Sequence, residues 1–108
     1  MIAAVIPTWN RADLLCRTIE SLQRQSLPPN EVVVVDNGST DDTRERAIHA
    51  GARVIEMGSN CGFARAVNAG IRAASAERIA IVNNDVEFDP AWLAHLWASG
   101  ARLELAAF

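Results

Sequence analysis

Four short runs dominated by apolar residues punctuate the chain, and between them apolar residues recur at every third or fourth position. The runs cover residues 2–6, 32–35, 52–57 and 78–82. Apolar runs rich in β-branched residues suit strands covered on both faces, whereas a strand with one wet face would alternate apolar and polar positions. The pattern therefore predicts an α/β fold in which a mainly parallel sheet is flanked by helices.

The segments between the runs carry helical spacing. Leu15, Ile19 and Leu22 fall at i, i+4 and i+7 within residues 12–25, the pattern of an amphipathic helix with one buried stripe. Asn10 is expected to cap that helix, and Pro7 is expected to close the strand before it. Further helices are predicted over residues 41–51, 63–74 and 89–100, and residues 101–108 could begin a fifth strand.

The predicted helix over residues 63–74 combines an apolar face with one candidate ligand. Phe63, Val67 and Gly70 follow helical spacing, and the missing side chain of Gly70 allows close approach to the sheet. Arg65 lies in the first turn, next to the loop that precedes the helix. It could reach a phosphate, and it could equally be a solvated helix arginine.

Two of the buried runs stop abruptly at polar residues. The valine run ends at Asp36, which an Asn-Gly turn follows, and residues 78–82 end at Asn83, Asn84 and Asp85. Ligands of open parallel sheets bind at the carboxyl ends of the strands, so we expect Asp36 and Asp85 to lie around one crevice. Asp36 is either a ligand contact or a brace for its own loop. Asp85, with the amide oxygens beside it, offers the hard oxygen ligands that suit Mg²⁺ or Mn²⁺.

Composition narrows the class of protein. The 108 residues are half hydrophobic, which suits one domain over residues 1–108. The net charge is -3, so the basic footprint of a nucleic-acid-binding protein is missing. No apolar run reaches about 18 residues, and Cys16 and Cys61 form no CxxC pair, which predicts a soluble protein with reduced thiols in the cytoplasm. Neither GxGxxG nor a lysine-bearing phosphate loop occurs, which disfavours NAD-dependent and P-loop enzymes.

Four segments, in the same order, resemble the N-terminal half of family 2 glycosyltransferases. They are Ile-Pro-Thr-Trp-Asn-Arg at 6–11, Val-Val-Val-Asp-Asn-Gly-Ser-Thr-Asp at 33–41, Asn-Cys-Gly-Phe-Ala-Arg-Ala-Val-Asn-Ala-Gly at 60–70 and Asn-Asn-Asp at 83–85. The resemblance implies a Rossmann-like GT-A fold. It also implies transfer of a sugar from a nucleoside-diphosphate donor to a saccharide or other acceptor, with inversion at the anomeric carbon. The chain then corresponds to the donor-binding portion of a longer catalytic domain, truncated before the second half.

The resemblance also assigns roles to motif residues. Pro7, Thr8 and Asn10 would line the nucleotide pocket, Asp36 would contact the base, and Ser39 would shape the neighbouring loop. Two residues are added to these: Arg65, from the first turn of a predicted helix, and Asn84, which follows a predicted strand. The expected substrate-binding residues are therefore Pro7, Thr8, Asn10, Asp36, Ser39, Arg65 and Asn84. Asp85 corresponds to the last acid of the family's metal and diphosphate motif. No catalytic residue is assigned, because the family's general base lies in the second half.

This sequence departs from the usual motifs of the family at two positions. Asn83 stands where the metal motif usually begins with aspartate, which weakens the electrostatic hold on a cation. Trp9 stands where a smaller aromatic is more usual, and it would stack near the nucleotide or simply pack.

The expected partners are a UDP-sugar or dTDP-sugar donor and a saccharide or lipid-linked acceptor, as in cell-surface polysaccharide synthesis, with Mg²⁺ or Mn²⁺ as cofactor. Without the general base we expect the chain alone to be inactive or barely active. The full-length enzyme is expected in the cytoplasm, peripheral to the inner face of the membrane. Apolar surface near Trp92 and Trp97 predicts self-association into a homo-oligomer. The alternative is a non-catalytic nucleotide-binding or regulatory module of the same fold.

Overall fold

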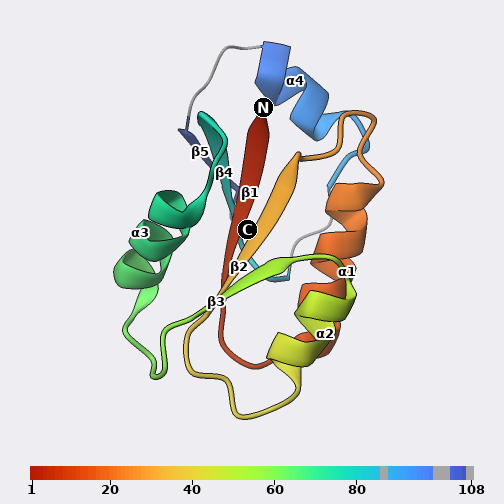
Figure 1. Ribbon diagram of the computed structural model, residues 1–108. Helices are drawn as coiled ribbons and strands as arrows, with labels where there is room; N and C mark the ends of the chain where they lie inside the picture. Colours follow the sequence, from red (N-terminus) through yellow and green to blue (C-terminus); the bar gives the residue numbers. More distant parts are fainter. Residues whose placement is uncertain (86–87, 99–102, 107–108) are drawn as a thin grey trace.

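Within residues 1–85, 88–98 and 103–106, which the computed structural model describes, five parallel strands form a sheet with helices on both faces (Figure 1). The strands are β1 (Ile2–Thr8), β2 (Glu31–Asp36), β3 (Arg53–Glu56), β4 (Arg78–Val82) and β5 (Leu103–Ala106). The helices are α1 (Ala12–Gln23), α2 (Thr43–His49), α3 (Phe63–Ala73) and α4 (Trp92–Ala98). The spatial order is β3-β2-β1-β4-β5, and every neighbouring pair is parallel. The predicted α/β fold is confirmed.

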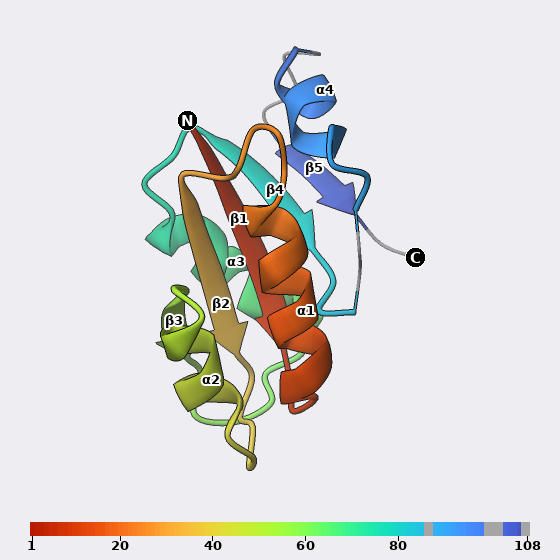
Figure 2. The same cartoon turned by 90° about the vertical axis from the view of Figure 1, so that its right-hand side faces the viewer.

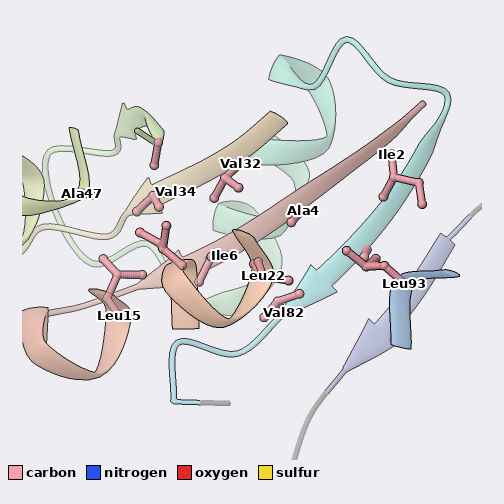
Figure 3. Packing of buried hydrophobic residues seen from close by; sticks show 13 residues of the cluster. Ile2, Ala4, Ile6, Leu15, Leu22, Val32, Val34, Ala47, Val82 and Leu93 are labelled. Carbon is pink, nitrogen blue, oxygen red and sulfur yellow. The ribbon is translucent and has the colours of Figure 1, made fainter. Parts of the chain in front are cut away.

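Side chains alternate between the two faces of the sheet, so the strands contribute to two separate hydrophobic cores. Even-numbered residues of β1, β2 and β4 pack with α1, α2 and α4, and odd-numbered residues pack with α3. Figure 2 shows α3 on the opposite side of the sheet from α1 and α2. Leu15, Ile19 and Leu22 are fully buried, which confirms the predicted stripe. Figure 3 shows Leu15 and Leu22 of this stripe in the same cluster as Ile6 and Val34 of the sheet.

The first strand continues past Pro7, so the prediction that this proline closes the strand was wrong. β1 pairs with β2 as far as Thr8, but its pairing with β4 ends at Val5. The Thr8 carbonyl accepts a hydrogen bond from the amide of Asn37, which follows β2, so the backbone groups of Thr8 face β2. Because backbone groups alternate in direction along a strand, the backbone nitrogen of Pro7 faces β4. β4 does not pair with β1 at this position, so no N–H donor is required and the proline is tolerated inside the strand.

Gly70 allows α3 to pack directly on β1 and β2. A methyl group at this position would overlap Cγ1 of Val5 and lie 2.9 Å from Cγ2 of Val35. Glycine is therefore what permits the helix backbone to approach the sheet so closely, as its place on the helix predicts.

The helix starts differ from the predicted caps. Arg11, in the left-handed region at φ 61°, precedes α1, and Asn10 does not cap it. α3 begins at Phe63 as expected, whereas α4 begins at Trp92 and not at the expected residue 89. The predicted helix end at Gly100 lies outside the described residues. Among the described residues, no helix combines the length and the apolar character needed to cross a membrane.

Candidate functional site

A cleft of about 440 Å³ opens where β1, β2 and β4 end. The loops that follow β1, β2 and β3 gather at this edge, which is the lower edge of the sheet in Figure 1. The residues that line the cleft are Pro7, Thr8, Trp9, Arg11, Asn37, Asn60, Phe63, Asn83 and Asn84. This edge is where open parallel sheets bind their ligands.

The structure brings only part of the expected substrate-binding set to the cleft wall. Pro7, Thr8 and Asn84 line it, whereas the others lie outside the lining, namely Asn10, Asp36, Ser39 and Arg65. Thr8 and Asn84 are joined, because Nδ2 of Asn84 donates to Oγ1 of Thr8 at 2.9 Å. Since the nitrogen of this amide is engaged, the Asn84 side chain keeps its oxygen as an acceptor for a ligand.

Asp36 is 5% exposed and acts as a brace for its own loop. Its Oδ1 accepts a hydrogen bond from the Ser39 amide at 3.0 Å. The next residue, Asn37, lines the cleft instead. Asp36 and Asp85 also do not follow adjacent strands, because β1 lies between β2 and β4. Neither Asp36 nor Asp85 is among the residues that line the cleft, and the expectation that both lie around one crevice stays a prediction.

Asn10 and Ser39 hold two loops together by reciprocal bonds. The Asn10 amide donates to Oγ of Ser39 at 2.7 Å, and the Thr40 amide donates to Oδ1 of Asn10 at 2.9 Å. Asn10 and Arg11 both have positive φ, 57° and 61°, which is costly for residues with a side chain. The bonds to the loop after β2 stabilise that conformation, and the residues on either side, Trp9 and Arg11, line the cleft.

Sequence reasoning named neither of the two cleft residues in and after the loop between β3 and α3. Asn60 comes from this loop and Phe63 from the start of α3, and both line the cleft. Helical spacing predicted that Phe63 packs in the core, but its side chain is 54% exposed. An aromatic residue directly after a glycine-rich loop is a weak signal for such a position, and periodicity alone favours burial.

The cleft lining is polar but nearly uncharged. Arg11 is the one ionisable residue among the lining residues, beside four asparagine carboxamides. Trp9 is 53% exposed and, with Phe63, offers an accessible ring face. Aromatic faces suit planar rings, carboxamides suit groups that both donate and accept hydrogen bonds, and a guanidinium suits a phosphate.

The residues after β4 fit a divalent cation of the hard type. Asn83 and Asn84 supply carboxamide oxygens beside the cleft, and Asp85 supplies an exposed carboxylate. Mg²⁺ commonly binds through one or two carboxylates together with substrate phosphates, so a single acid is sufficient. Within the described part of the chain, no group of three or more His, Cys, Asp or Glu side chains could hold a metal by itself.

The chain is similar to known glycosyltransferases in sequence and in structure. It is 39% identical over 110 residues to validoxylamine A glucosyltransferase from Streptomyces hygroscopicus subsp. jinggangensis, covering 94% of this chain and 26% of that protein. The mannosyltransferase PcManGT from Pyrobaculum calidifontis, solved with GDP-Man and Mn²⁺, superposes with a TM-score of 0.75 at 28% identity over 81% of this chain and 28% of its own. Glucosyl-3-phosphoglycerate synthase from Mycobacterium tuberculosis, solved with Mn²⁺, UDP and glucosyl-3-phosphoglycerate, gives 0.74 at 28% identity over 93% of this chain and 38% of its own.

These comparisons confirm the expected GT-A fold. The chain spans well under half the length of the curated relatives it matches. The family model for glycosyl transferase family 2 matches residues 3–104. The chain therefore belongs to glycosyl transferase family 2.

Proposed function

We propose that the cleft binds a nucleoside-diphosphate sugar, with UDP or dTDP as the nucleotide, and that the chain is the donor-binding portion of an inverting glycosyltransferase. The observation that carries this proposal is the cleft at the strand ends, whose lining joins two exposed aromatic rings, one guanidinium and the carboxamides of Asn60, Asn83 and Asn84. The likeness to structures solved with GDP-Man and with UDP supports it.

In this proposal Pro7, Thr8 and Asn84 contact the donor directly, and Arg65 at the start of α3 reaches the diphosphate. Asn10 and Ser39 serve the donor indirectly by holding the loop that carries Trp9. A contact of Asp36 with the base stays a prediction, because its described hydrogen bond braces the loop.

A divalent cation, Mg²⁺ or Mn²⁺, would be held by Asp85 with the carboxamide oxygens of Asn83 and Asn84. When bound, it neutralises charge on the diphosphate leaving group. The carboxamide at Asn83, in place of a second carboxylate, implies a weaker hold on the cation.

Transfer with inversion requires an acceptor hydroxyl to attack the anomeric carbon while the bond from that carbon to the diphosphate oxygen breaks. The hydroxyl proton passes to a general base, which the family places in the second half of the catalytic domain. We infer that this chain alone is inactive, and that the whole enzyme acts on a saccharide or lipid-linked acceptor. Its setting would be cell-surface polysaccharide synthesis at the cytoplasmic face of the membrane.

Calorimetric titration with UDP, dTDP and GDP, each with and without Mn²⁺, tests the donor assignment. Saturable binding of UDP or dTDP is expected. Trp9→Ala should weaken that binding about tenfold or more, because stacking of a base on an aromatic ring contributes about 1–3 kcal/mol. Trp97→Ala is the matched control, since Trp97 is also exposed but does not line the cleft. No binding of any nucleotide to the folded protein would refute the proposal and favour a regulatory module that binds no nucleotide.

The metal assignment is tested with a second matched pair. Asp85→Asn should abolish any Mn²⁺-dependent gain in UDP affinity, because it removes the carboxylate without disturbing a buried group. Glu77→Gln, an exposed acid at the opposite end of β4, should leave the gain intact. A gain that survives Asp85→Asn would place the cation elsewhere.

A further inference from the structure

The carboxamide of Asn37 joins the sheet to the loop between β3 and α3. Its Oδ1 accepts a hydrogen bond from the Cys61 amide at 2.9 Å, and its Nδ2 donates to Oδ1 of Asn60 at 3.2 Å and to the Gly62 carbonyl at 3.3 Å. The Asn37 amide donates to the Thr8 carbonyl at 2.8 Å. A side chain that is 7% exposed thus ties the end of β2 to residues 60–62, while its backbone continues the contact between β2 and β1.

Gly38 brings the same loop into direct contact with the end of β2. A methyl group on Gly38 would lie 2.8 Å from the carbonyl carbon of Ser59 and 2.9 Å from its Cα. These are backbone atoms, so they cannot rotate away as the tip of a side chain could. Gly38 therefore provides the space for the loop, and Asn37 provides the hydrogen bonds.

The loop and the first turn of α3 are held as one unit. The Gly62 carbonyl, which accepts from Asn37, also accepts from the Ala66 amide at 3.3 Å in the first turn of the helix. Oδ1 of Asn60 accepts from the Gly62 amide at 3.0 Å as well. A shift at Asn37 would therefore move both Asn60 and Phe63, which line the cleft.

We propose that Asn37 is the positioning residue of the donor cleft. It holds the β3–α3 loop and the start of α3 against β2, so that Asn60 and Phe63 form a fixed wall of the cleft. The inference rests on the proposed function of the cleft. Asparagine suits the role because its short side chain offers an acceptor and two donors together, and aspartate of the same shape offers acceptors alone.

Asn37→Asp separates positioning from a general loss of structure. The variant keeps the acceptor for the Cys61 amide but places a carboxylate oxygen against two acceptors, Oδ1 of Asn60 and the Gly62 carbonyl. Hydrogen exchange over residues 58–63 should become at least about tenfold faster, since two hydrogen bonds are lost. Exchange of the β1 and β2 amides should stay as in the wild type. Asn68→Asp, an exposed change of the same chemistry on α3, is the matched control.

Gly38→Ala distinguishes an effect through the loop from direct contact with the ligand, because Gly38 does not line the cleft. Both Gly38→Ala and Asn37→Asp should raise the Kd for UDP about tenfold or more, and Asn68→Asp should not. Should Asn37→Asp fail to fold, Asn37→Ser removes the same donor without adding charge.

Unchanged exchange of the loop in a folded Asn37→Asp variant would overturn the proposal. A loosened loop with an unchanged Kd for UDP would overturn it too, because the loop would then not position the cleft. Absence of UDP binding in the wild type would instead refute the proposed function, and the exchange data would still decide whether Asn37 holds the loop.

Discussion

Replacing Gly70 by alanine is expected to destabilise the protein by about 2 kcal/mol. The added methyl would overlap Cγ1 of Val5 and lie 2.9 Å from Cγ2 of Val35. Both valines are fully buried in adjacent strands of the sheet, and their β-branched side chains have few alternative rotamers. Overpacking that the neighbours cannot relieve costs about 3 kcal/mol, and the better helix propensity of alanine offsets about 1 kcal/mol of it.

Thermal unfolding followed by circular dichroism should show a midpoint about 10 °C lower for Gly70→Ala. The same substitution in a Val5→Ala background should lose most of its penalty, because the nearest overlapping atom is gone and the two changes are coupled. An unchanged or higher midpoint for Gly70→Ala would refute the reasoning. An equal loss of stability in both backgrounds would also refute it, because the contact with Val5 would then not limit how closely α3 packs on the sheet.

Two further predictions concern the loops around the cleft. Ser39→Ala should lower the free energy of unfolding by about 1 kcal/mol in urea, because the Asn10 amide loses its acceptor; Ser39→Thr keeps the hydroxyl, and equal losses in both variants would contradict the brace. The hydroxyl of Thr43, followed by its amide, lowers the pKa of the Asp41 carboxyl below the ordinary value of 3.8. The stabilisation from Asp41 is thus present above pH 3.8 and lost as the pH falls through the folded-state pKa. Thr43→Val should raise this pKa in an NMR titration, and an unmoved pKa would count against the hydrogen bond.

Strands and helices could be predicted where the residues that determine them lie within the same short segment of the chain. The valines of β2 are buried on both faces, and the stripe of α1 faces the sheet, so burial and periodicity agree there. The local rules gave wrong predictions for Pro7 and Asn10, because residues far away in the chain determine their surroundings. The ladder beside Pro7 ends because β4 pairs no further than Val5, and Asn10 is held in the left-handed region by Ser39.

The candidate site was predictable at the strand ends and not at the loops. Asn84 could be placed because parallel strands end at one edge, whereas Pro7 and Thr8 were assigned by the resemblance to the family. Whether Asp36 or the residue after it faces the cleft depends on where the ladder to β1 stops, and a single sequence does not contain that information. The exposure of Phe63 depends on how the preceding loop is tied down, which again involves residues far away in the chain.

The central place of β1 in the sheet bears on how the chain assembles during synthesis. β1 is synthesised before the other described strands, and its register pairs Ala3 with Glu31 on one side but Ile2 with Arg78 on the other. The side facing β4 must therefore wait until residues 78–82 have emerged, and pairing across such a separation is slow. During that interval an apolar strand has an open edge, which can pair with another chain. The arrival of β4 thus covers the second edge of β1, and β5 later covers the outer edge of β4.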